Sequence, residues 1–457
     1  STLTIEGGCI YDNGTVGDGF DGGAVKISGN STLNLEAGAV LAKNKGSWGG
    51  AVNAYNSTIN INGAIIAENE ALRRGGGIFA NGGNNGESKV YLNYGYVTCN
   101  TANETGVNNT ADGGGGIRLD GGSDLYMSGG YVTGNHSLVG GGGGIRAGFY
   151  DYNSSTMEIS ITGGYISGNT SGCEGCGLSV GASGSASISG NVYVTYNTMS
   201  DSPHWGGGGI FCADGATMRI ENLLVTGNHA GGFGGGLAGC STGRVFSFGT
   251  ENGAAIFDNT ADGVNMSGAV SSKDADRLYA NANEVFRISG YQDYFSALNS
   301  IVGNAMLGGG VENWTGSADG VQVSTTEPTD LLAAAYQMGL TSQASDADKS
   351  AAAAKATVVV MGNSSYTHGG GILCNGILVI GSVPEDREIV MPDRLEVQGF
   401  KEVISQLSGE QIQHPEDTFE FVISKEDETA TEGRRVIKKI KSSTVHEKNE
   451  SGNEVET

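Results

Sequence analysis

The sequence predicts an all-β protein, a parallel β-helix of about ten coils with three short strands in each coil. One supporting observation is an asparagine that recurs behind a short apolar strand, and the other is a glycine cluster that follows most of these asparagines. From the first to the ninth asparagine there are eight intervals in 246 residues, a mean period of 246/8 or about 31 residues. A fixed period of this size indicates a solenoid. The recurring asparagines are Asn13, Asn44, Asn69, Asn100, Asn135, Asn169, Asn197, Asn228, Asn259 and Asn363.

The first strand of each coil ends just before the asparagine. The residue three positions earlier is aliphatic in every repeat, as at Ile66 and Val97, so this column is expected to face a core. The asparagines should stack at one corner. There each side-chain amide can bond to the next one and to turn backbone that would otherwise be buried without a partner.

The second strand follows the glycines and the third strand follows the second. Their apolar residues alternate with other residues, as at Ile117 and Leu119 around Arg118. A period of two with a mostly polar alternate face predicts strands that are buried on one face only. Neighbouring coils should pair at about 4.8 Å, and the glycines allow positive φ at the remaining corners.

The repeated pattern of asparagine, variable loop and Gly-Gly-Gly-Ile resembles the glycine-rich right-handed β-helices of bacterial surface proteins, which are related to the polymorphic outer-membrane-protein repeats. The resemblance covers about residues 1–272 and 357–382. It implies a right-handed β-helix of the pectate lyase-like kind and is specific for architecture rather than for activity.

Composition excludes several classes of protein. The chain has 457 residues with 80 glycines and 5 prolines but no collagen period. Its formal net charge of −24 disfavours nucleic acid and anionic membranes as partners and favours solubility or cation binding. No apolar run is long enough to cross a bilayer. Because Ser1 to Ile5 already reads as a strand, we expect a signal peptide and further coils upstream.

The β-helix is expected to span residues 1–382, with a partly helical insertion at about 273–357. Thr329 to Met338 and Ser345 to Ala356 read as short helices, the second with a capping box. The insertion is expected either to pack on the β-helix and return to complete its last coil, or to form a flexible surface loop.

Residues 383–425 read as the start of a truncated β-sandwich-like module, and residues 426–457 read as a charged, mobile tail. The run Asp417 to Ile423 is similar to the first strand of isopeptide-forming pilin and Cna-B-type modules of Gram-positive cell walls. That resemblance implies Lys401 as the isopeptide lysine and Glu420 as the assisting acid. However, alternation points Glu420 away from the core side of the strand.

Two columns of side chains are candidates for ligand binding. The residue just before each glycine cluster is often aromatic or charged, which suits either stacking on sugar rings or packing over the corner. One step before the core column, tyrosines on four successive coils should stack outward, either stabilising the sheet or forming a flat carbohydrate platform. The candidates are Trp48, Arg74, Trp205, Phe233 and His368 in the first column, and Tyr96, Tyr131, Tyr165 and Tyr193 in the second.

A catalytic reading depends on two arginines. Arg118 and Arg146 should point outward on adjacent coils with Asp120 nearby. Pectate lyases, on a similar fold, use calcium-binding aspartates and an outward arginine as the base. No cofactor is required by the sequence, although calcium is possible at aspartates near the turns. Those aspartates are Asp18, Asp21, Asp112 and Asp262.

The sequence therefore favours a secreted, extracellular, adhesin-like β-helix of a bacterial cell surface that presents loops to glycans or surface proteins and is not an enzyme. Missing C-terminal sequence would attach it to the cell wall. The alternative is a calcium-dependent polysaccharide lyase or another glycan-active β-helix, and a third reading is a structural spacer. Carboxylates on three adjacent coils beside a basic residue would favour the enzyme.

Overall fold

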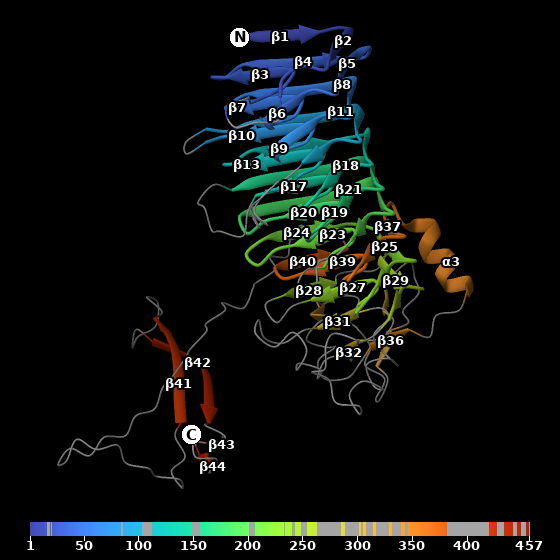
Figure 1. Ribbon diagram of the computed structural model, residues 1–457. Coiled ribbons are helices and arrows are strands. Elements are labelled where there is room, and N and C mark those ends of the chain that lie inside the picture. Colours follow the sequence, from blue (N-terminus) through green and yellow to red (C-terminus); the bar gives the residue numbers. More distant parts are fainter. Residues whose placement is uncertain are drawn as a thin grey trace, which may run out of the picture. The chain divides into compact units, whose positions relative to one another are not determined.

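The computed structural model contains a stack of coils built almost entirely from parallel strands, in agreement with the predicted fold class (Figure 1). It describes residues 1–15, 19, 21–83, 86–102, 112–148, 156–200, 206–232, 234–239, 243–247, 254–262 and 346–381, and the backbone of short strands between 285 and 342 and between 420 and 456. The chain divides into two compact units, Ser1–Ile389 and Val390–Thr457, and the coils belong to the first.

Sheet A follows one side of the stack and has two segments, A1 and A2, that meet at a bend. Four long strands contribute to both segments: β8 (Thr58–Ala67), β11 (Lys89–Thr98), β18 (Met157–Ser167) and β21 (Gly184–Thr195). Segment A1 also contains β1 (Thr2–Ile5), β4 (Thr32–Glu36), β14 (Asp124–Met127), β24 (Thr217–Ile220), β40 (Ile377–Ile380) and β28 (Arg244–Ser247). Segment A2 also contains β2 (Gly8–Tyr11), β5 (Ala39–Ala42), β15 (Tyr131–Thr133), β37 (Val358–Met361), β25 (Leu223–Thr226) and β29 (Ala254–Phe257).

Sheets B and C complete the coils. Sheet B starts after each ladder asparagine and contains β6 (Lys45–Trp48), β9 (Glu70–Arg74), β12 (Thr101–Ala102), β16 (His136–Ser137), β19 (Thr170–Ser171), β22 (Thr198–Met199), β38 (Ser364–Ser365), β26 (His229–Ala230) and β30 (Thr260–Ala261). Sheet C follows the glycines and contains β3 (Val25–Ser28), β7 (Val52–Tyr55), β10 (Ile78–Asn81), β13 (Ile117–Asp120), β17 (Ile145–Ala147), β20 (Leu178–Val180), β23 (Ile210–Cys212), β39 (Ile372–Cys374), β27 (Leu237–Gly239), β31 (Val285–Arg287) and β32 (Ile301–Val302). The alternating aliphatic residues of sheets A and C form one continuous core between them.

The asparagines form one ladder at the corner between sheets A and B. The backbone N–H and the Nδ2 of Asn135 both donate to Oδ1 of Asn169, each at 3.0 Å, and its Nδ2 also donates to the carbonyl of Val97 at 2.9 Å. The same three bonds recur down the stack, and nine of the ten asparagines are buried. The residue before each asparagine has a positive φ, which turns the chain into sheet B. These residues are Asp12, Lys43, Glu68, Cys99, Gly134, Gly168, Tyr196, Gly227, Asp258 and Gly362.

From β7 to β27, the outward residue between the two inward residues of each sheet C strand is buried, so the prediction of a half-buried strand with a polar outer face was wrong there. It is confirmed for β3, whose outward Lys26 and Ser28 are exposed. The outward residues are enclosed along with the inward ones, and they include Asn53, Phe79, Arg118, Arg146, Ser179, Phe211, Ala238 and Leu373. The cause is the glycine corner, which folds back over the sheet. Gly114 and Gly142 have positive φ, and a Cβ on either would lie within 2.8 Å of the Cβ of Arg118 or Arg146. Only glycine allows this close approach.

The coil formed by β37, β38, β39 and β40 lies inside the stack, which corrects the expectation that this segment completes the last coil. On its upper side it pairs in register with the coil that contains β21 to β24, through Val358 opposite Val192 and Ile372 opposite Ile210. On its lower side it pairs with the coil formed by β25 to β28. In Figure 1 the orange strands β37, β39 and β40 accordingly separate green from yellow-green strands.

The insertion contributes antiparallel strands at the end of the stack. β33 (Ala305–Leu307) pairs with β29, β35 (Thr329–Asp330) pairs with β28, and β32 pairs with β31, while β34 (Trp314–Gly316) pairs with β36 (Leu340–Ser342). Antiparallel strands on the last coil cover an edge that would otherwise be open. The helix expected from Thr329 begins instead as strand β35, because this segment pairs with the last rung of sheet A.

The second predicted helix is present as α3 (Asp346–Lys355). Its Ala352 packs against Leu224, Ala255 and Phe257 on the outer face of segment A2.

The second unit contains two antiparallel pairs, β41 (Glu420–Glu426) with β42 (Arg434–Lys441) and β43 (His446–Lys448) with β44 (Glu454–Glu456). β41 crosses the expected boundary at residue 425, and its partner lies in the segment expected to be a mobile tail. Lys401 and the side chain of Glu420 lie outside the described residues.

The ladder makes a direct prediction about stability. Asn135→Ala should lower the free energy of unfolding by about 3 kcal/mol, because it leaves buried backbone and amide groups on two neighbouring coils without partners. Asn13→Ala should cost about 1 kcal/mol or less, because Asn13 is exposed and has a described neighbour on one side only. Urea unfolding of both variants measures the difference, and equal costs would contradict the role assigned to the buried ladder.

Candidate functional site

The predicted column before the glycine clusters packs over its own corner. The Trp48 ring meets Phe79 edge to face at 4.9 Å between centroids, and the Arg74 guanidinium lies over Trp48 at 5.1 Å. His368 is buried, and burial lowers its pKa to about 4, so its ring is neutral near pH 7. Trp205 and Phe233 lie outside the described residues. The rings of this column that are described are therefore used in packing rather than presented to a ligand.

Arg118 and Arg146 are enclosed, which corrects the expectation that they point into solvent. Their exposed fractions are 0% and 2%, and they belong to a chain of charged groups beneath the glycine corner. Starting from sheet C, the Nε of Arg118 donates to Asp120 at 2.8 Å, and Asp120 accepts from Nη1 of Arg74 at 2.7 Å.

The chain of charges continues through Asp112, which accepts from Nε of Arg74. Nη1 of Arg146 donates to the carbonyl of Asp112 at 2.8 Å, and its Nη2 lies 3.1 Å from Oε1 of the fully buried Glu174. Three arginines thus meet three carboxylates, so the group is balanced in charge.

Burial sets the electrostatics of this network. It lowers the pKa of the Arg118 guanidinium to about 10, with the Asp120 carboxylate acting in the opposite direction. Arg118 therefore stays protonated near neutral pH. A general base must reach its substrate and release its proton near the working pH. Arg118 meets neither condition, and Arg146 is buried away from any substrate, so the geometry assigns both to holding the glycine corner against sheet C.

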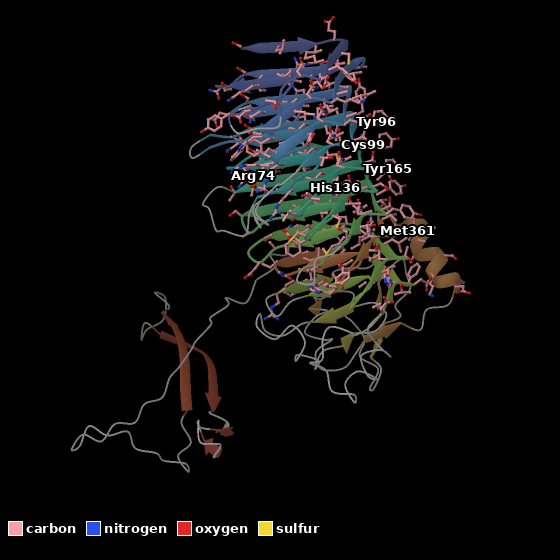
Figure 2. The ribbon with its side chains drawn as sticks, viewed as in Figure 1. Arg74, Tyr96, Cys99, His136, Tyr165 and Met361 are labelled. Carbon is pink, nitrogen blue, oxygen red and sulfur yellow. The ribbon has the colours of Figure 1, made fainter. Side chains whose placement is uncertain are left out.

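The four tyrosines stack on the outer face of segment A2. Successive centroids of Tyr96, Tyr131, Tyr165 and Tyr193 are 4.9, 5.1 and 4.8 Å apart, with interplanar angles of 7, 7 and 10°. The first three are 38–45% exposed. Figure 2 shows Tyr96 and Tyr165 on the same side of the stack. Because each ring face is covered by the next ring, this row presents ring edges and hydroxyl groups rather than open faces.

A second column of hydroxyl groups runs beside the tyrosines, two residues further along each strand. Thr133 donates to Thr98 at 3.2 Å, and Thr195 donates to Ser167 at 2.9 Å. The tyrosine row ends at Val359, which is opposite Tyr193 and packs near α3. We call the region of Tyr96, Tyr131, Tyr165, Tyr193 and these four hydroxyl residues the hydroxyl face. It repeats once per coil over four coils.

A carboxylate cluster on segment A1 was missed by the sequence reasoning. Asp124 accepts from the backbone N–H of Glu158 at 2.8 Å, and the Tyr126 hydroxyl lies 3.2 Å from Glu158 and 3.4 Å from Asp124. Glu87 is close enough to Asp124 for the two carboxyl groups to shift each other's pKa, and Nζ of Lys89 lies 3.1 Å from Oε2 of Glu87. Three successive coils thus supply three carboxyl groups, a lysine and a tyrosine.

The two coupled carboxyl groups of this cluster differ in pKa. Burial raises the pKa of Asp124 to about 6, and the hydrogen bond with Glu87 acts in the same direction. The pKa of Glu87 is lowered, first by the hydrogen bond from Asp124 and then by Lys89. Asp124 is therefore the proton carrier of the pair at mildly acidic pH. Burial, followed by the charges of Asp124 and Glu158, raises the pKa of the Tyr126 hydroxyl.

The column alignment carried a signal for this cluster. Lys89 and Asp124 are partners in register, and the next coil places Glu158 one residue before Ile159, the partner of Leu125. Aligning the coils on the asparagine period would have placed these residues in one column. The search for acidic residues was instead made at the loop corner.

Metal binding has no further support within the described parts of the chain, where no group of three or more His, Cys, Asp or Glu side chains is arranged to hold an ion. Of the aspartates considered for calcium, Asp21 pairs with Lys26 at 3.0 Å and Asp262 with His229 at 3.3 Å. Asp112 belongs to the arginine network, and Asp18 lies outside the described residues.

Comparison of this chain with protein families, curated proteins and solved structures found no match. Within the described residues, no helix has both the length and the apolar character needed to span a bilayer.

The arginine network predicts a strongly non-additive pair of substitutions. Arg146→Met should lower the free energy of unfolding by about 3–5 kcal/mol, because it leaves the buried Glu174 carboxylate without its countercharge. Arg146→Met combined with Glu174→Gln should recover much of that loss, because the uncompensated charge is gone. Urea unfolding of the two single variants and the double variant tests this, and additive losses would show that the two groups are not coupled.

The carboxylate cluster predicts an unusual titration. With aspartate carboxyls labelled with ¹³C, one resonance should titrate near pH 6 and vanish in Asp124→Asn. Because the folded pKa of Asp124 lies above its unfolded value of about 3.9, its contribution to stability is present below about pH 4 and is lost as the pH rises through 6. An Asp124 resonance that titrates near pH 4 would refute the raised pKa that burial and the interaction with Glu87 give this carboxyl group.

Proposed function

We propose that this chain is an adhesin-like binding β-helix of a bacterial cell surface, secreted and not catalytic, which recognises a repeating ligand through the hydroxyl face and its neighbouring loops. The observation that carries the proposal is the run of four stacked tyrosines, three of them 38–45% exposed, beside a column of hydroxyl groups that is partly exposed except at the buried Thr195.

A ligand that repeats along one direction matches this face best. Each of the four coils offers one phenolic hydroxyl, and the first three also offer a partly exposed threonine or serine hydroxyl, so successive units of a polymer meet similar donors and acceptors. An extended glycan is rich in complementary hydroxyl groups, and the exposed ring edges of the tyrosines give it an apolar contact. A host or environmental glycan is therefore the first ligand class to examine, and a surface protein is the second.

The cell-surface location is supported by likeness of sequence rather than by geometry. The asparagine and glycine repeats resemble those of glycine-rich bacterial surface β-helices, and Asp417 to Ile423 resembles a strand of pilin and Cna-B-type modules. The net charge of −24 suits a solvent-facing extracellular protein. In this proposal the C-terminal unit connects the β-helix to a stalk or to the cell wall, and calcium remains an optional ligand.

Retention on immobilised polysaccharides tests the proposal. The wild type should be retained by at least one acidic or neutral polysaccharide, and Tyr131→Phe should weaken retention by about fivefold, because it keeps the stack but removes one hydroxyl group, worth about 1 kcal/mol. Tyr131→Ala should weaken it further, by opening the stack at its centre.

Tyr55→Ala is the matched control, because Tyr55 is 43% exposed at the end of β7 in sheet C. Its retention should equal that of the wild type. Equal retention of the wild type and both Tyr131 variants on every retaining polysaccharide would exclude the hydroxyl face as the binding site. Retention by no glycan and no surface protein would favour the spacer reading.

A second candidate function is favoured by the carboxylate cluster. A glycan-active enzyme needs carboxyl groups of different pKa close together. Glu87, Asp124 and Glu158 lie on three successive coils, with Tyr126 contacting Asp124 and Glu158, and Lys89 beside Glu87. If the protein is a polysaccharide lyase or hydrolase, with or without calcium, this cluster rather than Arg118 and Arg146 is the place to look.

Product release from the same polysaccharide panel separates the two functions. With and without calcium, mass spectrometry should find no new oligosaccharides if the binding function is correct. Products that disappear in Asp124→Asn, but not in the control Asp214→Asn at an exposed turn, would establish the enzyme instead.

A further inference from the structure

The coil of residues 358–380 is held between two coils that belong to one continuous stretch of chain. β24 lies above it in segment A1, and β25 lies below it in segment A2. Only Glu221 and Asn222 connect β24 to β25, so the chain steps down two coils at this point instead of one. The inserted coil fills the space that this step leaves.

The inserted coil begins and ends at the connection itself. The backbone N–H groups of Thr357 and Val358 donate to the carbonyl of Asn222, and the N–H of Gly381 donates to the carbonyl of Ile220. The two ends of the inserted coil therefore lie beside each other, at the Glu221–Asn222 connection between β24 and β25. Because of this arrangement, the coil can enter from the side when the stack opens at Glu221 and Asn222, and no chain end has to be threaded through a closed loop.

Nothing in the spacing of the chain requires the two-coil step. The inward residues Ile220, Leu223 and Val225 are separated by three and then two positions. The inward residues of an ordinary coil, Ile61, Ala64 and Ile66, have the same spacing. The space is thus held open by the coil that occupies it, and both of its walls are ordinary coil surfaces that accept any strand set with the correct inward pattern.

The 358–380 coil has the correct pattern in every sheet, whether it comes from the same chain or from another copy. It supplies inward Val358, Val360 and Ile372, and Asn363 continues the ladder from Asn197 to Asn228 at 2.8 Å on each side. The 83 residues (346 − 262 − 1) between Asp262 and Asp346 connect the coil to its lower neighbour, and they include β31, β33 and β35, which pair with β27, β29 and β28. The coil makes the same contacts with its two neighbours in both cases. The intramolecular arrangement is therefore favoured only because the coil and its site belong to one chain.

We propose that the 358–380 coil is an exchangeable element, and that the space between the β24 and β25 coils accepts the same coil from a second copy of this chain. Two copies that exchange coils form a closed, reciprocal pair with all native contacts retained, which is domain swapping of a whole coil. Within one chain, the coil is present near its own site at an effective concentration at or below about the millimolar range. A second chain can compete with it when the protein concentration approaches that value, so exchange is expected when chains fold together at high concentration.

Refolding of two differently tagged wild-type chains tests this. The chains are unfolded together, refolded at about 1 μM and at several hundred micromolar, and captured through one tag. The second tag should co-purify in a dimer after concentrated refolding, and at least tenfold less after dilute refolding. The pair should survive dilution to nanomolar concentration and should separate only on unfolding, because the exchanged coil is bonded on both sides. Native chains mixed after separate refolding should not exchange tags.

Two substitutions in one strand supply the matched comparison. Val360→Asp places a charge on the inward, fully buried side of β37, and Met361→Asp places the same charge on the outward, half-buried side. When both chains carry the substitution, Val360→Asp should abolish dimers and Met361→Asp should retain them. If Val360→Asp fails to fold, the dilution test on the wild type still decides.

The proposal is overturned if refolding at every concentration gives monomers alone. It is equally overturned if the dimer dissociates on dilution without unfolding, or if folded Val360→Asp chains form it undiminished, because either result assigns the dimer to an outer surface.

Discussion

Satisfaction of the backbone at one corner is the constraint on which the rest of this structure depends. Each ladder asparagine bonds to the next asparagine and to a core-strand carbonyl of the preceding coil. These bonds require the next coil to lie in register at one strand spacing. Once the corner is fixed, the inward columns of sheets A and C must face each other at every level. The asparagine ladder thus keeps the core uniform, because it prevents a one-residue shift in register that would turn the aliphatic columns outward.

The same periodicity determines where the outward polar side chains lie. Where the glycine corner folds back over sheet C, outward arginines are covered and must find carboxylates, and the result is a balanced, enclosed network. Where sheet A has no such cover, outward side chains of successive coils line up in contact with solvent, as Tyr96, Tyr131 and Tyr165 do. Enclosure at one corner and exposure at another thus decide which columns a ligand can reach, and these columns lie on sheet A.

Much of this arrangement can be predicted from the sequence, because the period is short and each column has one residue class. The asparagine ladder, the aliphatic core columns and the outward stack of tyrosines all follow from counting. The outward direction of Arg118 also follows from alternation, but its burial does not, because strand parity gives the face of a sheet and not what covers that face. The carboxylate cluster combines residues of one column that are 34 or 35 positions apart in sequence, which only an alignment of all columns brings together.

The order of the coils is the part that no column pattern determines. Every coil presents the same edges and the same inward residues, so stacking in sequence order and stacking with a coil inserted satisfy the repeat equally well. What distinguishes them lies outside the repeat. Helix α3 directly precedes β37 and packs on Leu224, Ala255 and Phe257, and its Lys349 bonds to Asp258 at 2.6 Å. These contacts exist only when the 358–380 coil lies next to the β25 coil. Because α3 travels with its coil, the device that selects the coil order is equally available to a coil from a second chain.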